Sequence, residues 1–175
     1  MKNVHNGLVP INKLPTEVLC HIFGSVIYDD TTIQEIRQAL LVLTSVCQNW
    51  RHTVVSNGVF WSNIVMKPSP PSIECADAFL TRSSGALLNV VVDNRSGEWS
   101  GSPLLERCLE DLSTNGHRIR KYSIFFGGSL TLLQQVTKFN VPRLGILRLD
   151  ASGALYNDHG QARLPRIFHG SLPGL

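Results

Sequence analysis

Residues 14–23 read LPTEVLCHIF, a proline followed by a run whose polar members are Thr16, Glu17 and His21. Pro15 suits the first position of a helix, where its missing N–H costs nothing. Glu17 in the first turn interacts favourably with the positive end of the helix dipole. Apolar side chains then recur at helical spacing: Leu14, Val18, Leu19, Ile22, Phe23 and Val26. This band is wider than one small core needs, so it predicts a helix that packs in its own core and also binds a groove on another protein.

Two more helices are predicted downstream. Thr32 and Glu35 have the spacing of a capping box, and apolar residues then continue at helical spacing: Ile33, Ile36, Leu40 and Leu43. Residues 45–55 carry Val46, Cys47, Trp50 and Val54 on one face. That segment either continues the second helix or is separated from it by a break near residues 44–45. Residues 57–58, Asn-Gly, end it because both tolerate a left-handed conformation.

The short motifs of this region resemble the F-box, in the form common among fungal F-box proteins. They are LPTEVL at 14–19 with IF at 22–23, then VCQNWR at 46–51, and then FW at 60–61. The resemblance covers residues 11–61. It implies a docking role, since F-box proteins bind a Skp-type adaptor that joins them to a cullin scaffold carrying a ubiquitin-charged enzyme. The rest of an F-box chain selects the target protein.

The resemblance also implies which residues bind the adaptor, because apolar anchors dominate such interfaces. The expected adaptor-binding set is Leu14, Pro15, Val18, Leu19, Ile22, Phe23, Val46 and Cys47. The expected module core is Trp50, Phe60 and Trp61, with the last two folding back onto Trp50. The connection between Phe23 and Val46 is longer than in the compact motif, and residues 28–31 would loop out at little entropic cost. That length leaves open which residues of the second helix reach the adaptor, and on pattern alone the three helices could be an ordinary bundle core.

The expected domains are an F-box at 11–66, a proline-rich linker at 67–73 and a partial leucine-rich-repeat-like region at 74–175. The linker reads KPSPPSI, and its prolines predict a non-helical spacer. Beyond it, helices are predicted at 74–82, 103–115 and 129–138, and strands at 86–92, 119–126 and 144–149. Alternating strands and helices predict parallel pairing. The fold class is therefore α+β, a three-helix module followed by an α/β region.

A repeat is indicated in the second region. Residues 118–124 and 143–149 share a pattern of apolar positions 25 residues apart, inside the range of leucine-rich repeats. Residues 171–175 begin what would be the next unit, so we expect an incomplete array and a truncated product. The alternative is an ordinary small α/β domain.

Composition excludes several classes of function. The chain is 43% hydrophobic and 17% charged, with a net charge of +3, which is typical of a folded globular protein that binds neither nucleic acid nor membranes. The four cysteines are widely spaced and have no zinc pattern, so we expect reduced thiols, no metal and no cofactor. No signal peptide or membrane span is apparent, which favours the cytoplasm or nucleus.

Three features of the sequence could serve other functions. Residues 126–129, FGGS, form a glycine turn that could cradle a phosphate in a small α/β enzyme, but they lack a longer fingerprint. Cys47 and His52 are expected on different faces of their helix, which disfavours a nucleophile with its base. The run HRIRK at 117–121 is expected to be a solvated face or to bind an acidic partner. The sequence therefore favours a non-catalytic receptor subunit of a Skp–cullin–F-box (SCF) ubiquitin ligase, with an adaptor-binding scaffold outside ubiquitin transfer as the alternative.

Overall fold

The computed structural model of the chain describes residues 9–28, 33–96, 99, 103–127 and 135–151. Two compact units are present: a helical unit of residues 1–61 with 82–84, and a sheet unit of residues 62–81 with 85–175. Several sequence-based predictions lie outside the described residues. They are the Thr32 side of the capping box, most of the helix at 129–138 and everything after residue 151.

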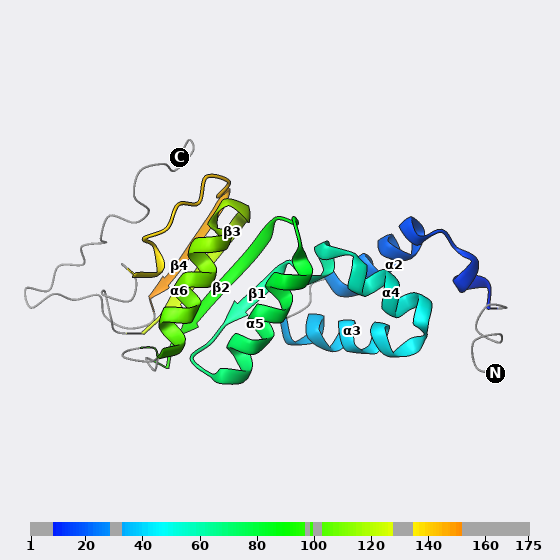
Figure 1. Cartoon of the computed structure of the whole chain (residues 1–175), viewed down its shortest axis with the longest axis horizontal. Coiled ribbons are helices and arrows are strands. Elements are labelled where there is room, and N and C mark those ends of the chain that lie inside the picture. Colours follow the sequence, from blue (N-terminus) through cyan, green and yellow to red (C-terminus); the bar gives the residue numbers. More distant parts are fainter. Residues whose placement is uncertain (1–8, 29–32, 97–98, 100–102, 128–134, 152–175) are drawn as a thin grey trace, which may run out of the picture. The chain divides into compact units, whose positions relative to one another are not determined.

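The helical unit has three α-helices, as the sequence predicts (Figure 1). Its elements are η1 (Pro10–Lys13), α2 (Thr16–Tyr28), α3 (Ile33–Val46), α4 (Gln48–Ser56) and η2 (Gly58–Trp61). Pro15 precedes the first helical residue, and its carbonyl accepts hydrogen bonds from the N–H groups of Val18 and Leu19. The break between α3 and α4 falls at Cys47, whose backbone is extended, rather than near residues 44–45. Its position lets α4 fold back and pack against α3.

The core of the helical unit takes one stripe from each helix and the aromatic pair of η2. Its buried apolar residues are Leu19, Phe23, Ile27, Ile36, Leu40, Leu43, Val54, Phe60 and Trp61. Trp61 donates from its indole N–H to the carbonyl of Val54 at 2.9 Å. The guanidinium of Arg82 lies 4.6 Å from the centre of the Trp61 ring, which ties residues 82–84 to this unit.

The sheet unit is a four-stranded parallel sheet in the order β1-β2-β3-β4 (Figure 1). Its elements are β1 (Asn63–Met66), α5 (Pro70–Ser83), β2 (Leu88–Asn94), α6 (Pro103–Asn115), η3 (Gly116–Arg118), β3 (Ile119–Phe126) and β4 (Ile146–Ala151). The predicted parallel pairing is confirmed, and α6 and β3 have the predicted bounds. Each strand pairs with the next one along the chain. The two can run parallel because a helix or another connecting segment returns the chain to the starting edge of the sheet.

One sequence-based prediction is wrong at the boundary of this unit. Residues 67–73 are not a non-helical spacer, because α5 begins at Pro70. Pro70 and Pro71 occupy the first turn, where a missing N–H breaks no helical hydrogen bond. Residues 63–66, at the end of the predicted F-box range, form β1 and pair with β2.

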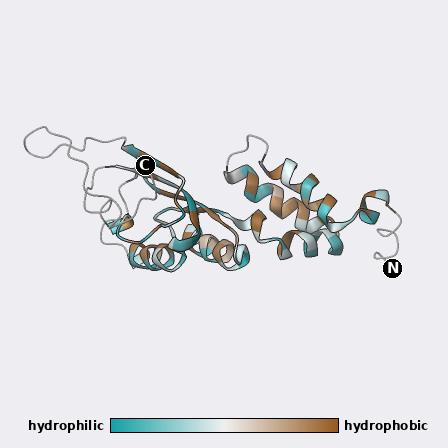
Figure 2. Ribbon diagram, turned by 90° about the horizontal axis from the view of Figure 1, so that it is seen from above, coloured by the Kyte–Doolittle hydropathy of each residue, from teal (hydrophilic) through white to brown (hydrophobic). Residues whose placement is uncertain are grey.

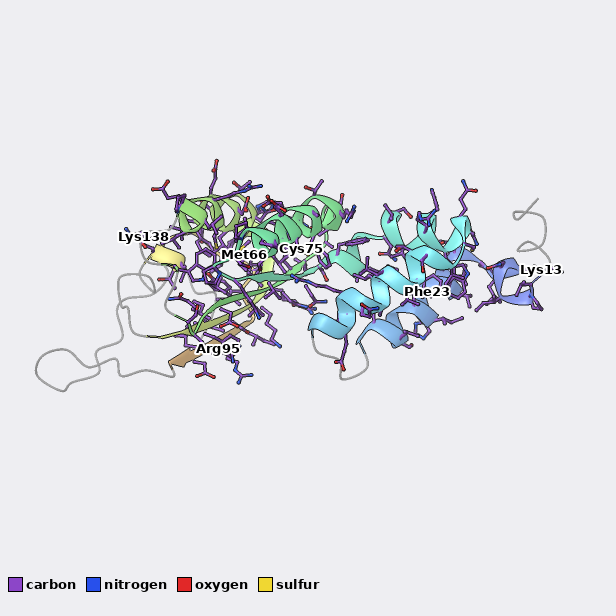
Figure 3. The ribbon with its side chains drawn as sticks, turned by 90° about the horizontal axis from the view of Figure 1, so that it is seen from below. Lys13, Phe23, Met66, Cys75, Arg95 and Lys138 are labelled. Atoms are coloured by element: carbon purple, nitrogen blue, oxygen red, sulfur yellow. The ribbon has the colours of Figure 1, made fainter. Side chains whose placement is uncertain are left out.

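The sheet packs its core against α5 and α6, which lie on the same face (Figures 1 and 3). Figure 2 shows hydrophobic residues along both the strands and the helices. Side chains on the helix-covered face are fully buried: Ile64, Met66, Val90, Val92, Tyr122 and Ile124. The Tyr122 hydroxyl donates to the carbonyl of Val136 at 2.9 Å, so residues 135–138 lie on this face as well. Burial in this core raises the pKa of the Cys108 thiol, which keeps that thiol protonated and unreactive.

Replacing Gly116 with alanine should destabilise the sheet unit by about 1–3 kcal/mol. A Cβ at this position would collide with the backbone carbonyl oxygen of Asn140 and lie 3.2 Å from Cδ2 of Phe139. Amide hydrogen exchange of β2 and β3 measures the loss, because these strands report the opening of the unit. Gly145→Ala is the matched control, since its Cβ would meet the Arg120 carbonyl oxygen at 3.8 Å, an ordinary contact. Equal exchange rates in the two variants would contradict this prediction, because they would show that the backbone at residue 140 moves away from a Cβ at residue 116 without loss of stability.

Candidate functional site

An uncovered apolar row runs along α2. Leu14 precedes the helix, and Val18, Ile22 and Val26 follow at intervals of four residues, so the three helical side chains lie on one side of α2. Val18 and Val26 are exposed and Ile22 is half-buried. Pro15 is exposed beside Leu14. Removing apolar side chains from water is favourable, so a partner that covers this row would gain binding free energy. The row is therefore suited to docking.

The end of α3 carries a second set of exposed apolar side chains. Leu41, Val42 and Val46 are more than half exposed, and Val42 and Val46 share one side of the helix at a spacing of four residues. Val46 is in the predicted adaptor-binding set, while Leu41 and Val42 are not. The sequence signal for them is the run LLVL at 40–43, because four consecutive apolar residues cannot all face one core from a helix. Leu40 and Leu43 are the buried members.

Leu19 and Phe23 are placed differently from the sequence-based expectation. Both belong to the predicted adaptor-binding set, but each side chain is only 1% exposed. They lie on the face of α2 that packs in the helical unit, and the Phe23 ring contacts Trp50 with 4.7 Å between ring centres. Figure 3 shows Phe23 among these helices. Both side chains therefore belong to the core of the unit, and the exposed part of the predicted set is Leu14, Pro15, Val18 and Val46.

The predicted core aromatics hold the unit together in two places. Phe60 and Trp61 are buried. Trp50 is half-buried, and its ring partner is Phe23. The Trp50 indole N–H donates to Oδ1 of Asn12 at 2.8 Å. This hydrogen bond fixes η1 against α4, and thereby sets where the chain enters α2 at Leu14.

An open groove lies beside the row, between α2 and η2. It has a volume of about 720 Å³ and is lined by Glu17, Cys20, His21, Gly24, Ser25, Asn57, Val59 and Phe60. The side-chain amide of Asn57 donates to the sulfur of Cys20 at 3.1 Å, so the thiol is engaged in a structural contact. Val59 on the groove wall is exposed. The groove extends the surface around α2 that a partner could contact.

The other candidate sites gain no support from the geometry. Cys47 lies in the break between α3 and α4, while His52 is an exposed residue of α4. Gly127 has a packing role, since a Cβ there would lie 2.9 Å from the carbonyl oxygen of Arg95; Gly128 and Ser129 lie outside the described residues. Within the described ranges, no three His, Cys, Asp or Glu side chains gather as metal ligands. No described helix has the length and apolar character of a membrane span.

Comparison with known proteins identifies the helical unit. The F-box-like family model matches residues 11–67. The match spans η1, α2, α3, α4, η2 and β1. No curated protein and no solved structure matches the chain. The chain thus carries an F-box-like domain at its N-terminal side, followed by a small parallel sheet with helices.

Proposed function

We propose that the chain is the substrate-receptor subunit of an SCF-type ubiquitin ligase, with the helical unit binding a Skp-type adaptor. One observation carries the proposal: the F-box-like match at residues 11–67 covers the helices that present uncovered apolar side chains. An apolar surface that remains uncovered on a folded module is typical of an interaction site. The adaptor-binding side chains are then Leu14, Pro15, Val18, Ile22, Val46 and Cys47.

The sheet unit holds the target protein in this proposal. Its strands follow one another in order, all parallel, with α5 and α6 on one face. This arrangement supports a leucine-rich-repeat-like unit, in which each strand and its following segment add one layer. The relationship to the fungal form of the F-box is supported by the short sequence motifs at 14–23, 46–51 and 60–61. The location that suits this role is the cytoplasm or nucleus.

The subunit does no chemistry itself and needs no cofactor. Its contribution is to hold the target near the ubiquitin-charged enzyme that the cullin carries. Holding two reactants together raises their effective concentration and removes much of the entropic cost of their encounter. A target lysine would then attack the activated ubiquitin at a rate set by the complex.

Co-elution tests this function against the adaptor-binding scaffold that works outside ubiquitin transfer. The full chain is mixed with a Skp-type adaptor and a cullin, and the mixture is separated by size-exclusion chromatography. We expect one peak that contains all three proteins. A peak with the chain and the adaptor but without the cullin would contradict the receptor role and favour the scaffold.

A further inference from the structure

The sheet presents a second face, on the side away from α5 and α6. Side chains alternate between faces along a strand, so Lys121, Ser123 and Phe125 of β3 lie opposite the buried Tyr122 and Ile124. In β4 the register places Ile146 beside Lys121, Arg148 beside Ser123, and Asp150 beside Phe125. Figure 3 shows Arg95 on this side of the sheet. No described helix covers this face, and although Ser123 is buried, Lys121, Ile146 and Arg148 are exposed. This exposed part of the face is a candidate binding surface.

The centre of this face is an aromatic ring with two arginines. The guanidinium carbons of Arg95 and Arg148 lie 5.2 Å and 5.3 Å from the centre of the Phe125 ring. A guanidinium over an aromatic ring gains a cation–π attraction. Both side chains remain more than half exposed, at 59% and 63%. Each guanidinium therefore lies near the ring and still has surface open to solvent.

A buried carboxylate fixes one of these arginines further. Arg95 donates from Nε and Nη2 to the two carboxylate oxygens of Asp93, at 2.9 Å and 2.7 Å. The Asp93 side chain is mostly buried, and the hydrogen bond from Arg95 holds its pKa below the usual range. Because the pair is bidentate, the orientation of Arg95 is set before any ligand arrives. Preorganisation of this kind lowers the entropic cost of binding.

Positive charge exceeds negative charge on this face. The cationic face comprises Lys67, Arg95, Lys121 and Arg148, and its two carboxylates are Asp93 and Asp150, which leaves a surplus of two positive charges. Asp93 takes both Arg95 and Lys67 as partners. Arg148 forms a long ion pair with Asp150, with 3.9 Å between Nη2 and Oδ2, which is beyond hydrogen-bond distance. Lys121 is exposed on β3. The surplus positive charge is therefore carried by Lys121 and Arg148, which lie diagonally across β3 and β4, because Lys121 pairs with Ile146 and Ser123 pairs with Arg148.

We propose that the cationic face binds an acidic segment of polypeptide, whose carboxylates accept hydrogen bonds from Arg148, Arg95 and Lys121. This inference rests on the proposed function, because it names the chemistry of the target that the sheet unit holds. Planar guanidiniums match carboxylates in shape as well as in charge. The exposed Ile146 beside Lys121 gives an apolar contact at the edge of the site.

Charge and geometry favour this occupant over three others. A single-stranded nucleic acid needs free aromatic rings for base stacking, but both arginines already lie over the Phe125 ring. Residues 152–175 contain one aspartate and two arginines, so this segment does not complement the face. A second copy related by two-fold symmetry would bring like charges together.

Fluorescence anisotropy tests the inference with the full chain and a labelled oligoglutamate peptide. We expect binding that weakens as salt is raised and that falls by about tenfold when Lys121→Ala and Arg148→Ala are combined. Lys121→Ala alone should produce part of this loss, and Lys138→Ala is its matched control. It removes the same charge from an exposed lysine in the segment that contacts Tyr122 on the helix-covered face, and should leave binding unchanged.

Four results would overturn the inference. They are equal binding of an oligoglutamine peptide of the same length, an equal loss in Lys138→Ala, tighter binding of single-stranded RNA through the same two residues, and a dimer in analytical ultracentrifugation that the double variant abolishes. Adaptor binding by the double variant is measured in parallel. A chain that binds the adaptor but does not prefer oligoglutamate refutes this inference alone. A chain that prefers oligoglutamate but does not bind the adaptor refutes the proposed function alone.

Discussion

Replacing Phe23 with alanine should destabilise the helical unit by about 3–5 kcal/mol, the usual cost of emptying a buried aromatic site. Phe23 is 1% exposed and its ring packs on Trp50. The cavity would separate α2 from α4, and loss of the Trp50 contact would loosen η1, which the Trp50–Asn12 hydrogen bond holds. Amide hydrogen exchange of α2 and α4 in the full chain measures the effect, because it reports this unit without requiring two-state unfolding of the whole chain.

Val26→Ala is the control for this substitution. Val26 lies on the same helix, is also apolar, and is 54% exposed, so its truncation should change stability by about 0.5 kcal/mol or less. If Phe23→Ala and Val26→Ala gave the same exchange rates in α2, the Phe23 side chain would not be part of the core. The assignment of Phe23 to packing rather than to adaptor contact would then fail.

Replacing Val18 with aspartate should weaken adaptor binding by about 2 kcal/mol or more, roughly thirtyfold in Kd, and leave the chain folded. Val18 is an exposed residue in the first turn of α2, where a carboxylate is favoured by the helix dipole. The same carboxylate would be costly under an adaptor, because a charge removed from water without a partner is strongly unfavourable. Titration calorimetry measures the change in Kd, and circular dichroism checks the fold.

Val55→Asp is the matched control for adaptor binding. Val55 is 43% exposed and Val18 is 42% exposed, so the two substitutions place the same charge at similarly exposed sites. Val55 lies on α4, outside the predicted adaptor-binding set. We expect adaptor affinity to survive in Val55→Asp. A variant pair that lost affinity equally, or kept it equally, would show that the row on α2 is not the contact surface.

The helical unit was largely predictable because its signals are local. Pro15, Glu17 and the apolar spacing of residues 18–26 are enough to predict α2. In the sheet unit, Pro103 and Gly116 delimit α6 by equally local signals. The Asn-Gly pair at 57–58 predicts the end of α4 correctly, but the expected left-handed backbone at Asn57 is not the reason that the helix ends there. Asn57 has an extended backbone rather than a left-handed one, and Gly58 is required because a Cβ there would collide with the Ser83 carbonyl oxygen. Such a contact between distant residues leaves no local pattern in the sequence.

The missed elements depend on tertiary contacts. β1 is four residues long and is stabilised by its pairing with β2, so its short apolar run does not by itself predict a strand. Trp99 lies in a Gly/Ser-rich stretch, yet it is fully buried and donates from its indole N–H to the carbonyl of Asp93 at 3.2 Å. A lone aromatic in such a stretch is the one signal that could have predicted this packing.

The division of the apolar band on α2 was predicted only in part. Sequence spacing showed that the band is too wide for one core, but not which edge packs inside. Leu19, Phe23 and Ile27 are buried, while Val18 and Val26 are exposed. The direction is set by where α3 and α4 pack, which depends on the break at Cys47. Neither the helix propensities of the residues around Cys47 nor the spacing of apolar residues predicts a break at that position.

Binding of the full chain to a purified Skp-type adaptor, measured by titration calorimetry, tests the central claim most directly. The full chain is used because residues 82–84 contribute the Arg82–Trp61 contact to the helical unit. We predict a one-to-one complex with a negative heat-capacity change, the signature of apolar surface being buried. No heat of binding from a chain whose α2 and α4 amides are protected from exchange would contradict the claim and leave the F-box-like unit without its proposed partner.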